Sequence, residues 1–491
     1  MRELVRKICG KYADHTALVQ GRGAKRRACT YGELYEMICA AVKWFGSKGI
    51  CGEKICVAGR NSIDYAVLFF AVQISGNILI PVSERYSGED IRYITENSGC
   101  RHVIADEAMK GFFPAESGYI LTGMEELVQV YEDFRCGDMK STQSDISMIV
   151  YTSGTSGNMN GVMLSQKNIT ESFTALAEVC KVSGKVIFSL PVNHLYSWGA
   201  NFFLPFNSGL EITIAADTKE FFRLLMTLSP ECIFTVPMEL EMFMKMIRRD
   251  IERYSLGGFE GDLSGKREHY RKAYSFLGEN AKKLYTAGAV LDGELASQFY
   301  DVGLALGNIY GSTECSPFIS YCDDPYDGSI GEPLRCCEVK SDDNELLVRG
   351  SNVMSGYYGM SEKTAEVITD GWYHTGDIIS VNENGRMVIT GRKRNIIVLS
   401  SGENISPEET ESKIKAFPGV REVIVRSSGG HLTAEIFSDE GYEEDIRENM
   451  RQMNQALPEY RRIAEIKFRD TPFEKTAINK IKRKIPDECY R

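Results

Sequence analysis

Apolar residues recur at helical spacing in the first part of the chain and alternate there with short apolar runs. Residues 33–49 have the spacing of an amphipathic helix and end in a glycine-rich stop. A strand is predicted at 54–59, then a helix that Ser62 can cap and that continues through Ile74, and then a strand at 77–82. This strand–helix–strand order predicts a mainly parallel sheet with helices on both faces.

Similar short apolar runs continue along the next two hundred residues. They predict strands at 147–151, 185–190, 210–215, 232–236 and 283–286. The charged stretch 239–283 is predicted to be helical, with interruptions at Gly257, Gly258, Gly261 and Gly265. From about Glu332 the pattern changes to short strands and turns.

The last hundred residues predict a small α+β unit. A helix should begin at Pro407 and run to about Ala416, a hairpin should turn at Gly429-Gly430, and a second helix should cover 443–456. The expected fold class is therefore α/β, with a large N-terminal domain of layered sheets and helices and a small α+β C-terminal domain. We place the boundary at Gly391–Arg394, which gives domains of 1–391 and 392–491.

Composition narrows the class of protein. The chain has 491 residues, of which 43% are hydrophobic and 25% charged, as is typical of a folded globular protein. Its formal net charge of −11 disfavours nucleic acid as the main partner, because an acidic surface repels phosphate backbones. The 14 cysteines form no CxxC pair and the six histidines have no metal-binding spacing, so a structural zinc site is not expected.

The cysteine content and the apolar segments of the chain predict its cellular compartment. Many unpaired thiols in a large acidic chain favour a reducing compartment, so we expect the protein to be cytoplasmic. The N-terminus lacks the continuous apolar core of a signal peptide. The most apolar stretch, 65–82, is broken by polar residues and by Pro81, which predicts a buried helix and a strand and no transmembrane segment.

Three loops carry residue types suited to binding a nucleotide. YTSGTSGNMNG at 151–161 follows an apolar strand, and its hydroxyls, glycines and amides suit phosphate oxygens, although it is not a Walker loop. NIYGSTE at 308–314 offers an aromatic ring, a hydroxyl and a carboxylate. GWYHTGD at 371–377 ends in an acid that can accept from ribose hydroxyls. Taken singly, the alternatives are a flexible Gly/Ser loop, a turn after a strand, and a turn with an exposed Asp.

Together these motifs resemble those of the adenylate-forming superfamily, which includes acyl-CoA synthetases, aryl-CoA ligases, luciferases and the adenylation domains of peptide synthetases. GRKRNIIVLSSGENISPEE resembles the hinge and the start of the C-terminal subdomain, and KTAINKIKR resembles the segment with the catalytic lysine. The matches run from about residue 30 to residue 483. GSNVMSGYYG and YGSTECSP are most similar to fatty acyl-CoA synthetases. The resemblance implies that the C-terminal domain is mobile.

The resemblance implies a role for particular residues. The nucleotide would be bound by Thr152, Ser153, Gly154, Thr155, Ser156 and Gly157 of the phosphate loop, Gly288, Ala289, Val290, Asn308, Tyr310 and Gly311 around the adenine, and Asp377 and Arg392 at the ribose. Thr313 would contact the α-phosphate and Glu314 would hold Mg²⁺. Lys480 would be the adenylation lysine, and His194 would lie beside the acyl pocket, with a lone core histidine as the alternative.

Three more positions follow from the resemblance, and the chain departs from the family's pattern at two places. Arg394 falls at the hinge, where the family usually has Asp or Lys, and Ser401 and Gly402 belong to the turn over which the pantetheine of CoA passes. Met159-Asn160 replaces the usual Pro-Lys of the phosphate loop and removes a charge that would face pyrophosphate. Asn479 replaces a Gly, a mild change because Asn tolerates positive φ.

The implied activity has two steps and uses ATP, Mg²⁺ and CoA. A carboxylic acid would attack ATP to give an acyl-adenylate, and a thiol would then displace AMP to give a thioester. VNHLYSWGANFFLPF lacks the Asp of amino-acid-activating relatives, and its aromatic residues favour a fatty or related apolar acid, with an aryl acid next, unless they simply form core. CoA is the expected acceptor. The alternatives are a ligase for a phosphopantetheinylated carrier protein and an inactive AMP-binding pseudo-ligase, although the presence of Lys480 argues against the latter.

Overall fold

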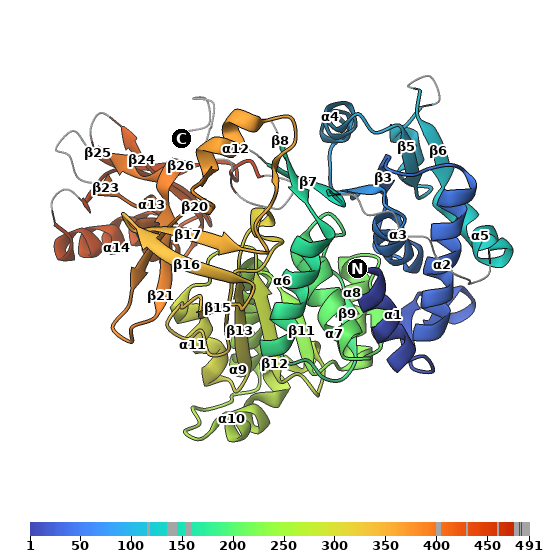
Figure 1. The fold of residues 1–491 in the computed structure, drawn as a ribbon. Coiled ribbons are helices and arrows are strands. Elements are labelled where there is room, and N and C mark those ends of the chain that lie inside the picture. The colour runs from blue at the N-terminus through green and yellow to red at the C-terminus, as the bar shows by residue number, and fades with distance from the viewer. Residues whose placement is uncertain are drawn as a thin grey trace. The chain divides into compact units, whose positions relative to one another are not determined.

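The computed structural model describes residues 1–114, 118–134, 145–153, 159–398, 404–428, 431–458, 461–475, 481 and 483. The chain divides into two compact units. The larger comprises Met1–Val339 and Val348–Tyr373, and the smaller comprises Lys340–Leu347 and His374–Arg491. Figure 1 traces both from the blue N-terminus to the red C-terminus.

The larger unit contains a seven-stranded sheet in the order β18-β8-β7-β4-β3-β5-β6 (Figure 1). Its strands are β3 (Lys54–Ala58), β4 (Ile78–Val82), β5 (His102–Ala105), β6 (Ile120–Gly123), β7 (Met148–Ser153), β8 (Met159–Leu164) and β18 (Gly356–Tyr357). The strands from β7 to β6 are parallel, and β8 and β18 are antiparallel additions. The predicted parallel sheet is therefore confirmed.

Two smaller sheets complete the strand layers of this unit. One has the order β11-β12-β13-β14-β15, with β11 (Cys232–Thr235), β12 (Lys283–Ala287), β13 (Ala305–Tyr310), β14 (Ser320–Cys322) and β15 (Glu332–Pro333). The other has the order β2-β1-β10-β9, with β1 (Thr16–Gln20), β2 (Arg27–Thr30), β9 (Val186–Phe188) and β10 (Ile212–Ile214). Strands β11, β12 and β13 are parallel to one another, so their carboxyl ends share one edge.

Helices separate and cover these sheets. They are α1 (Arg2–Lys11), α2 (Tyr31–Ser47), α3 (Ile63–Ile74), α4 (Gly88–Ser98), α5 (Leu127–Asp133), α6 (Gln166–Val179), α7 (Leu204–Asn207), α8 (Thr218–Leu228), α9 (Pro237–Arg253), α10 (Leu263–Tyr270), α11 (Gly293–Asp301) and α12 (Ser361–Val367). A π-helical segment, Ser197–Phe203, precedes α7.

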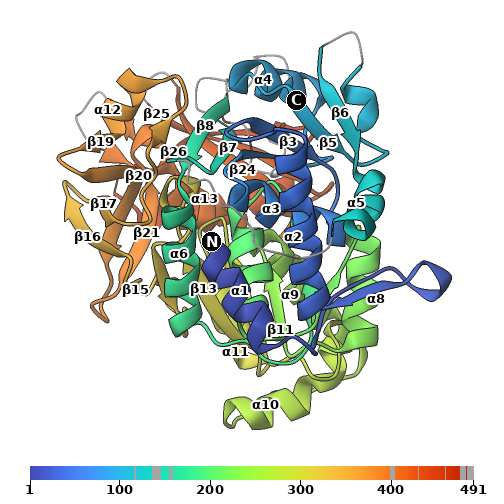
Figure 2. The same ribbon diagram turned by 45° about the vertical axis from the view of Figure 1, so that its right-hand side comes forward.

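Helix α3 shows why the most apolar stretch of the chain is not a membrane span. The hydroxyl of Ser62 caps it by accepting from the Tyr65 amide at 3.0 Å. Every residue from Ile63 to Ile74 is buried, because α3 packs against β3 and β4 on one side and β1 on another, beside α2 (Figures 1 and 2). A helix enclosed in this way has no polar face, and burial on all sides selects apolar residues around its whole circumference. Within the described ranges, no helix is both long and apolar enough to span a membrane.

The smaller unit has a core of its own. It contains the antiparallel pair β22 (Ile397–Val398) and β23 (Asn404–Ile405), the sheet of β24 (Val420–Ser428), β25 (His431–Ser438) and β26 (Ile463–Arg469), and helices α13 (Pro407–Lys415) and α14 (Glu443–Ala456). Ile414 of α13, Ile436 of β25 and Ile446 of α14 are fully buried together. Ser428 pairs with His431, so the predicted hairpin around Gly429-Gly430 is confirmed, although those two glycines lie outside the described residues.

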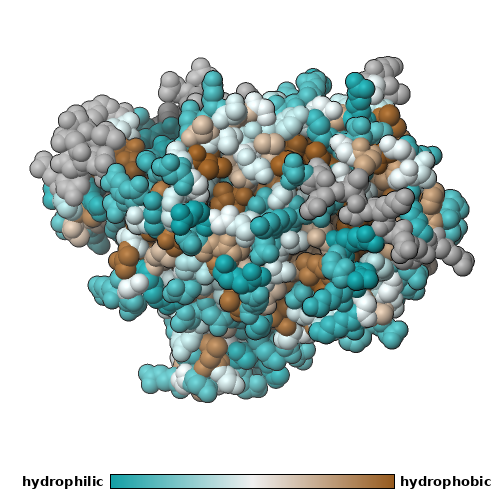
Figure 3. Space-filling model, viewed as in Figure 1, coloured by the Kyte–Doolittle hydropathy of each residue, from teal (hydrophilic) through white to brown (hydrophobic). Residues whose placement is uncertain are grey.

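The division between the units passes through strands. β16 (Cys337–Asp342), β17 (Glu345–Gly350) and β20 (Trp372–Val381) each have residues in both units, and β19 (Ile368–Thr369) and β21 (Met387–Arg392) pair with β20. Residues 374–391 thus belong to the smaller compact unit. The boundary of 391/392 marks an expected hinge and stays a prediction. On the face drawn in Figure 3, hydrophobic residues are scattered among hydrophilic ones.

Candidate active site

Two of the predicted adenine-binding segments meet at one edge of the five-stranded sheet. Gly288 directly follows β12, and Tyr310 is the last residue of the neighbouring parallel strand β13. Gly288 has a φ of +85°, a conformation that favours glycine, and Val290 beyond it is 58% exposed. Ligands of open α/β sheets bind at the carboxyl ends of the strands, so this edge suits a planar ring.

Asn308 lies two residues before this edge and is oriented by the fold. Its side chain is buried, and its Nδ2 donates to the carbonyl of Ser329 at 3.0 Å. The hydrogen bond fixes which end of the amide is the acceptor, because Nδ2 must face Ser329. The remaining Oδ1 is the type of atom that an exocyclic amino group of adenine needs.

The turn after Tyr310 has a packing reason for its glycine. A Cβ on Gly311 would lie 1.9 Å from the carbonyl oxygen of Pro317, so no other residue fits here without a shift of the backbone. The turn carries Thr313 and Glu314, both half-buried. Gly311 thus contributes by allowing close approach of two backbone segments.

Glu314 accepts a hydrogen bond from a tyrosine that lies outside the predicted nucleotide-binding motifs. Tyr357 of β18 donates its hydroxyl to Glu314 Oε1 at 3.0 Å, and the Glu314 carbonyl accepts from the Met354 amide at 2.8 Å. Burial and the neighbouring Glu314 carboxylate raise the pKa of Tyr357 well above its ordinary value. Tyr357 therefore stays neutral and keeps its proton as a donor to Glu314. In the sequence this tyrosine belongs to SGYYG, part of a segment that resembles fatty acyl-CoA synthetases.

The carboxylate of Glu314 fits a magnesium ion bound together with a nucleotide. In the described part of the chain, no three His, Cys, Asp or Glu side chains cluster closely enough to form a metal site of their own. Mg²⁺ often takes one or two carboxylates from the protein and completes its shell with phosphates and water. A single carboxylate, steadied by a phenol hydroxyl on one oxygen, matches that donor set.

The phosphate-loop motif spans the turn between two antiparallel strands. Thr152 of β7 pairs with Asn160 of β8. Gly154, Thr155, Ser156 and Gly157 lie outside the described residues, as does the side chain of Ser153. Asn160 is buried, and its Oδ1 accepts from Nζ of Lys363 in α12 at 2.9 Å. The residue that replaces the usual loop lysine is therefore bonded to another lysine.

The predicted ribose pair comes together across two strands of the smaller unit. Asp377 of β20 pairs in register with Arg392 of β21, and Arg392 Nε lies 2.6 Å from Asp377 Oδ1. The Asp377 side chain is only 4% exposed, so the alternative of a turn with an exposed Asp is wrong. A carboxylate has two acceptor oxygens, so Asp377 can accept from ribose hydroxyls while one of its oxygens is paired with Arg392.

A second buried carboxylate, that of Glu345, binds residues of the GWYHTGD motif. It was not among the predicted site residues. Glu345 of β17 accepts from the backbone amide of Gly376 at 3.0 Å, from His374 Nδ1 at 3.2 Å and from Lys393 Nζ at 2.7 Å. Burial alone would raise the pKa of Glu345, but these hydrogen bonds outweigh it and leave the pKa below its ordinary value. No local pattern marked this residue, because its partners are distant in sequence.

The aromatic residues near His194 pack into the hydrophobic core. Trp198 stacks on Phe69 with ring centroids 3.9 Å apart and donates its Nε1 proton to the Val192 carbonyl at 2.7 Å. Phe202 is fully buried as well. This packing matches the core alternative for these rings, so they give no information on the acid. His194 itself is half-buried, and its backbone amide donates to the Pro191 carbonyl at 3.1 Å.

The remaining predicted residues lie in the smaller unit. Lys480, Ser401 and Gly402 lie outside the described residues, and Arg394 lies on a 3₁₀ turn, Lys393–Asn395. Arg483, three residues after Lys480, pairs with Glu411 of α13 at 2.6 Å. This ion pair attaches the end of the KTAINKIKR segment to α13.

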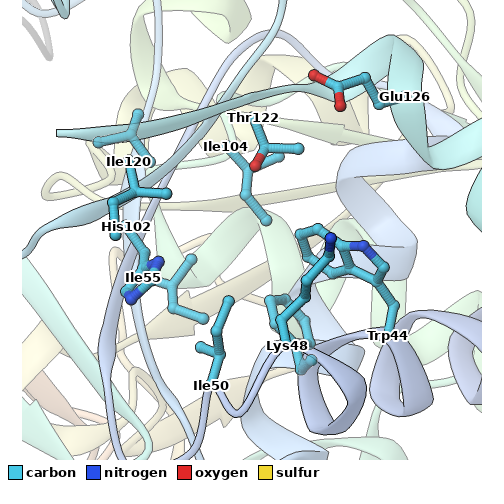
Figure 4. Close-up of a pocket in the computed structure, with 11 residues that line it drawn as sticks. Trp44, Lys48, Ile50, Ile55, His102, Ile104, Ile120, Thr122 and Glu126 are labelled. Carbon is cyan, nitrogen blue, oxygen red and sulfur yellow. The ribbon is translucent and has the colours of Figure 1, made fainter. Parts of the chain in front are cut away.

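A surface pocket elsewhere carries none of the predicted site residues. It lies near the amino ends of β3, β5 and β6 and is lined by residues including Trp44, Lys48, Ile55, His102 and Ile120 (Figure 4). In that sheet the phosphate-loop motif follows the opposite, carboxyl ends of the parallel strands. The pocket is therefore separate from the candidate active site.

Comparison with known proteins agrees with the motifs. Residues 5–358 match the AMP-binding enzyme family, which is well over half of the chain. The chain belongs to this family. The matched range includes the phosphate-loop motif and the NIYGSTE motif but ends before GWYHTGD.

Individual relatives of this AMP-binding enzyme are CoA ligases. A long-chain-fatty-acid–CoA ligase of Mycobacterium bovis is 26% identical over 450 residues, which cover 81% of this chain and 74% of the relative. An indoleacetate–CoA ligase of Aromatoleum aromaticum is 26% identical and covers 96% and 95%. The structure of o-succinylbenzoate CoA synthetase from Bacillus subtilis with its acyl-adenylate intermediate superposes with a TM-score of 0.79 at 18% identity, over 98% of this chain and 96% of the other. The expected α/β fold is confirmed by this likeness.

Proposed function

We propose that this AMP-binding enzyme is an ATP-dependent acid–thiol ligase, which activates a carboxylic acid as an acyl-adenylate and transfers the acyl group to CoA. The observation that carries the proposal is the family match, extended over almost the whole chain by relatives that are CoA ligases. The buried pair of Asp377 with Arg392 and the Tyr357–Glu314 contact support it, because each supplies a group that nucleotide chemistry needs.

In the first step, the acid's carboxylate attacks the α-phosphorus of ATP, the bond to the bridging oxygen breaks, and pyrophosphate leaves. No protein nucleophile is required, so binding, orientation and charge stabilisation do the work. Asn308 Oδ1 accepts from the adenine amino group, Asp377 accepts from the ribose hydroxyls, and the Thr313 hydroxyl donates to the α-phosphate. Glu314 would hold Mg²⁺, which would supply positive charge to balance the phosphate oxygens. Lys480 adds a positive charge at the α-phosphate.

In the second step, the thiolate of CoA attacks the acyl carbonyl, and the bond to AMP breaks. Ser401 and Gly402 border the path of the pantetheine, and the smaller domain turns about Arg394 between the two steps. Such an exchange of catalytic groups by domain rotation uses one binding site for two reactions.

The acid is a fatty or related apolar acid, with an aryl acid as the second candidate. The fatty acid is favoured by the similarity to a long-chain-fatty-acid–CoA ligase, and the aryl acid by the equally identical indoleacetate–CoA ligase. Loading of a phosphopantetheinylated carrier protein is the alternative to CoA as acceptor. We also propose a cytoplasmic location, because the cysteines that the structure describes are free thiols, which suits a reducing compartment.

The deciding experiment is acid-dependent exchange of labelled pyrophosphate into ATP. The panel contains fatty acids of graded chain length, aryl acids and amino acids. Exchange with a fatty or aryl acid supports the proposal and identifies the acid class. Exchange with amino acids alone contradicts the acid assignment, and nucleotide binding without any exchange identifies a pseudo-ligase. The active acid is then offered with CoA or with loaded carrier proteins, and thioester formation on the carrier alone would contradict CoA as acceptor.

A further inference from the structure

Lys363 reaches the phosphate-loop strands from a separate helix. It lies in the first turn of α12, and its Nζ is 2.9 Å from Asn160 Oδ1 and 5.5 Å from the ring centroid of Tyr357. The turn is fixed to β18, since the Thr364 hydroxyl accepts from the Tyr357 amide at 2.9 Å. Gly356 leaves the space for this contact, because a Cβ there would lie 2.6 Å from the Thr364 side chain. The position of Lys363 is therefore built into the fold.

No carboxylate of the described residues neutralises the charge of Lys363. Among the described residues, no Asp or Glu oxygen lies within the 4.0 Å that defines an ion pair with this lysine, and its neighbours are an amide oxygen and an aromatic ring. An ammonium group has three donors, and Asn160 takes one of them. The hydroxyl of the same Tyr357 donates to Glu314, so the cation lies one tyrosine ring away from the carboxylate that fits Mg²⁺.

The Lys363 ammonium group can compensate for the lysine that Asn160 replaces in the phosphate loop. A lysine usual at that position would project its ammonium group from β8 beside Thr152, its partner across the hairpin. The short amide of Asn160 plus a 2.9 Å hydrogen bond spans about the length of a lysine side chain. The Lys363 ammonium group therefore lies about as far from the backbone of residue 160 as the ammonium group of a lysine at that position would.

We propose that Lys363 binds the β,γ-phosphates of ATP and stabilises the leaving pyrophosphate, in place of the lysine absent from the phosphate loop. The inference rests on the proposed function, since it requires ATP at this site. Lys363 forms no covalent bond in the step. When the bond between the α-phosphorus and the bridging oxygen breaks, the electron pair goes to pyrophosphate, and the ammonium group balances part of that new charge.

Binding of three phosphate ligands to Lys363→Met tests the proposal directly. Titration calorimetry is carried out with pyrophosphate, ATP and AMP, each with Mg²⁺. We expect the affinities for pyrophosphate and ATP to fall at least tenfold and the affinity for AMP to stay unchanged, because AMP lacks the β- and γ-phosphates. The salt dependence of pyrophosphate binding should also become weaker, as one cation no longer contacts the ligand. Equal losses for ATP and AMP would show a structural role and overturn the proposal, as would unchanged binding of all three.

Lys54→Met is the matched control. Lys54 also lies against a tyrosine ring, that of Tyr358, with 4.8 Å from Nζ to the centroid, and it donates to the Tyr358 hydroxyl and the Ser98 carbonyl. It contacts neither Asn160 nor Tyr357, so its loss should leave pyrophosphate affinity unchanged. A fall equal to that of Lys363→Met would mean that any half-buried lysine near this sheet has the same effect, which contradicts the proposal.

A charge-relocation variant completes the test. Adding Asn160→Lys to Lys363→Met should restore at least half of the lost pyrophosphate affinity, whereas Asn160→Lys alone should give no gain, because two ammonium groups would compete for one place.

If Lys363→Met does not fold, Lys363→Gln replaces it, since Gln keeps a donor to Asn160 and lacks the charge. These titrations separate the two proposals: pyrophosphate exchange by the unmodified enzyme tests the ligase activity, and the difference between ATP and AMP tests Lys363. Failure of the double variant to regain affinity would contradict the proposed equivalence of positions 160 and 363.

Discussion

Replacing Asp377 by Asn should weaken nucleotide binding through the ribose hydroxyls alone. Asn has the same shape and keeps one acceptor oxygen, but it lacks the charge that strengthens a hydrogen bond. A hydrogen bond to a charged group contributes about 1.5–3 kcal/mol and a neutral one about 0.5–1.5 kcal/mol, so the change removes about 1–1.5 kcal/mol for each hydroxyl bound. Since about 1.4 kcal/mol corresponds to a factor of ten, the affinity for ATP should fall about five- to twelvefold for each hydroxyl bound.

The assay compares ATP with its analogue that lacks the 2′- and 3′-hydroxyls. In the unmodified enzyme the analogue should bind more weakly than ATP, and in Asp377→Asn this difference should shrink by the factor lost for ATP, because the analogue has no hydroxyls to lose. Glu345→Gln is the matched control, because Glu345 is equally buried, with a side chain 4% exposed, and accepts from Lys393 and His374. It should leave the ratio of the two affinities unchanged.

The reasoning about Asp377 can fail in two distinct ways. Equal losses for ATP and the dideoxy analogue would mean that Asp377 acts through the fold and not through the ribose. Unchanged binding of both, with the thermal unfolding temperature preserved, would place Asp377 outside the nucleotide site. A fall for the control variant as large as that for Asp377→Asn would show that any buried carboxylate of this sheet matters equally.

Three further outcomes follow from the structure and the motifs. The pKa of Glu345 is lowered in the folded protein, so its ionised form stabilises the fold above its unfolded pKa of about 4.3, and this stabilisation is lost as the pH falls through the folded pKa. Glu345→Gln should therefore flatten the acid side of a curve of unfolding free energy against pH, measured by urea titration. An unchanged curve would contradict this. Trp198→Ala should lower the free energy of unfolding by about 3–5 kcal/mol. Met226 is 63% exposed, so the control Met226→Ala should lower it by less than about 0.5 kcal/mol. Similar values for the two variants would refute the assignment of Trp198 to the core. Lys480→Ala should abolish most acyl-adenylate formation yet leave thioester formation from supplied acyl-adenylate intact, and equal loss of both half-reactions would assign Lys480 a general structural role.

Local sequence patterns predicted many of the elements closely. The strands at 54–59 and 77–82 and the helix that Ser62 caps are present within one or two residues, and so is the helix from Pro407. These elements depend on side chains near one another in sequence: a cap, a periodic apolar face, a glycine at a turn. The motifs were readable for the same reason, because the groups that bind one part of a nucleotide come from one loop. Strand β17, which contains Glu345, has its first half in the smaller compact unit and its second half in the larger, since packing follows space and not chain order.

The sequence by itself therefore determined the family, the α/β class and the order of the nucleotide-binding loops. Only the tertiary structure decided what surrounds each loop. It showed that Trp198 packs in the core, that Asp377 is buried against Arg392, and that Tyr357 binds Glu314. It also brought Lys363 to Asn160 across 203 residues of chain, a distance over which no local pattern carries information. A missing charge in a loop is visible in the sequence, but the cation that can replace it is visible only where a strand and a distant helix meet.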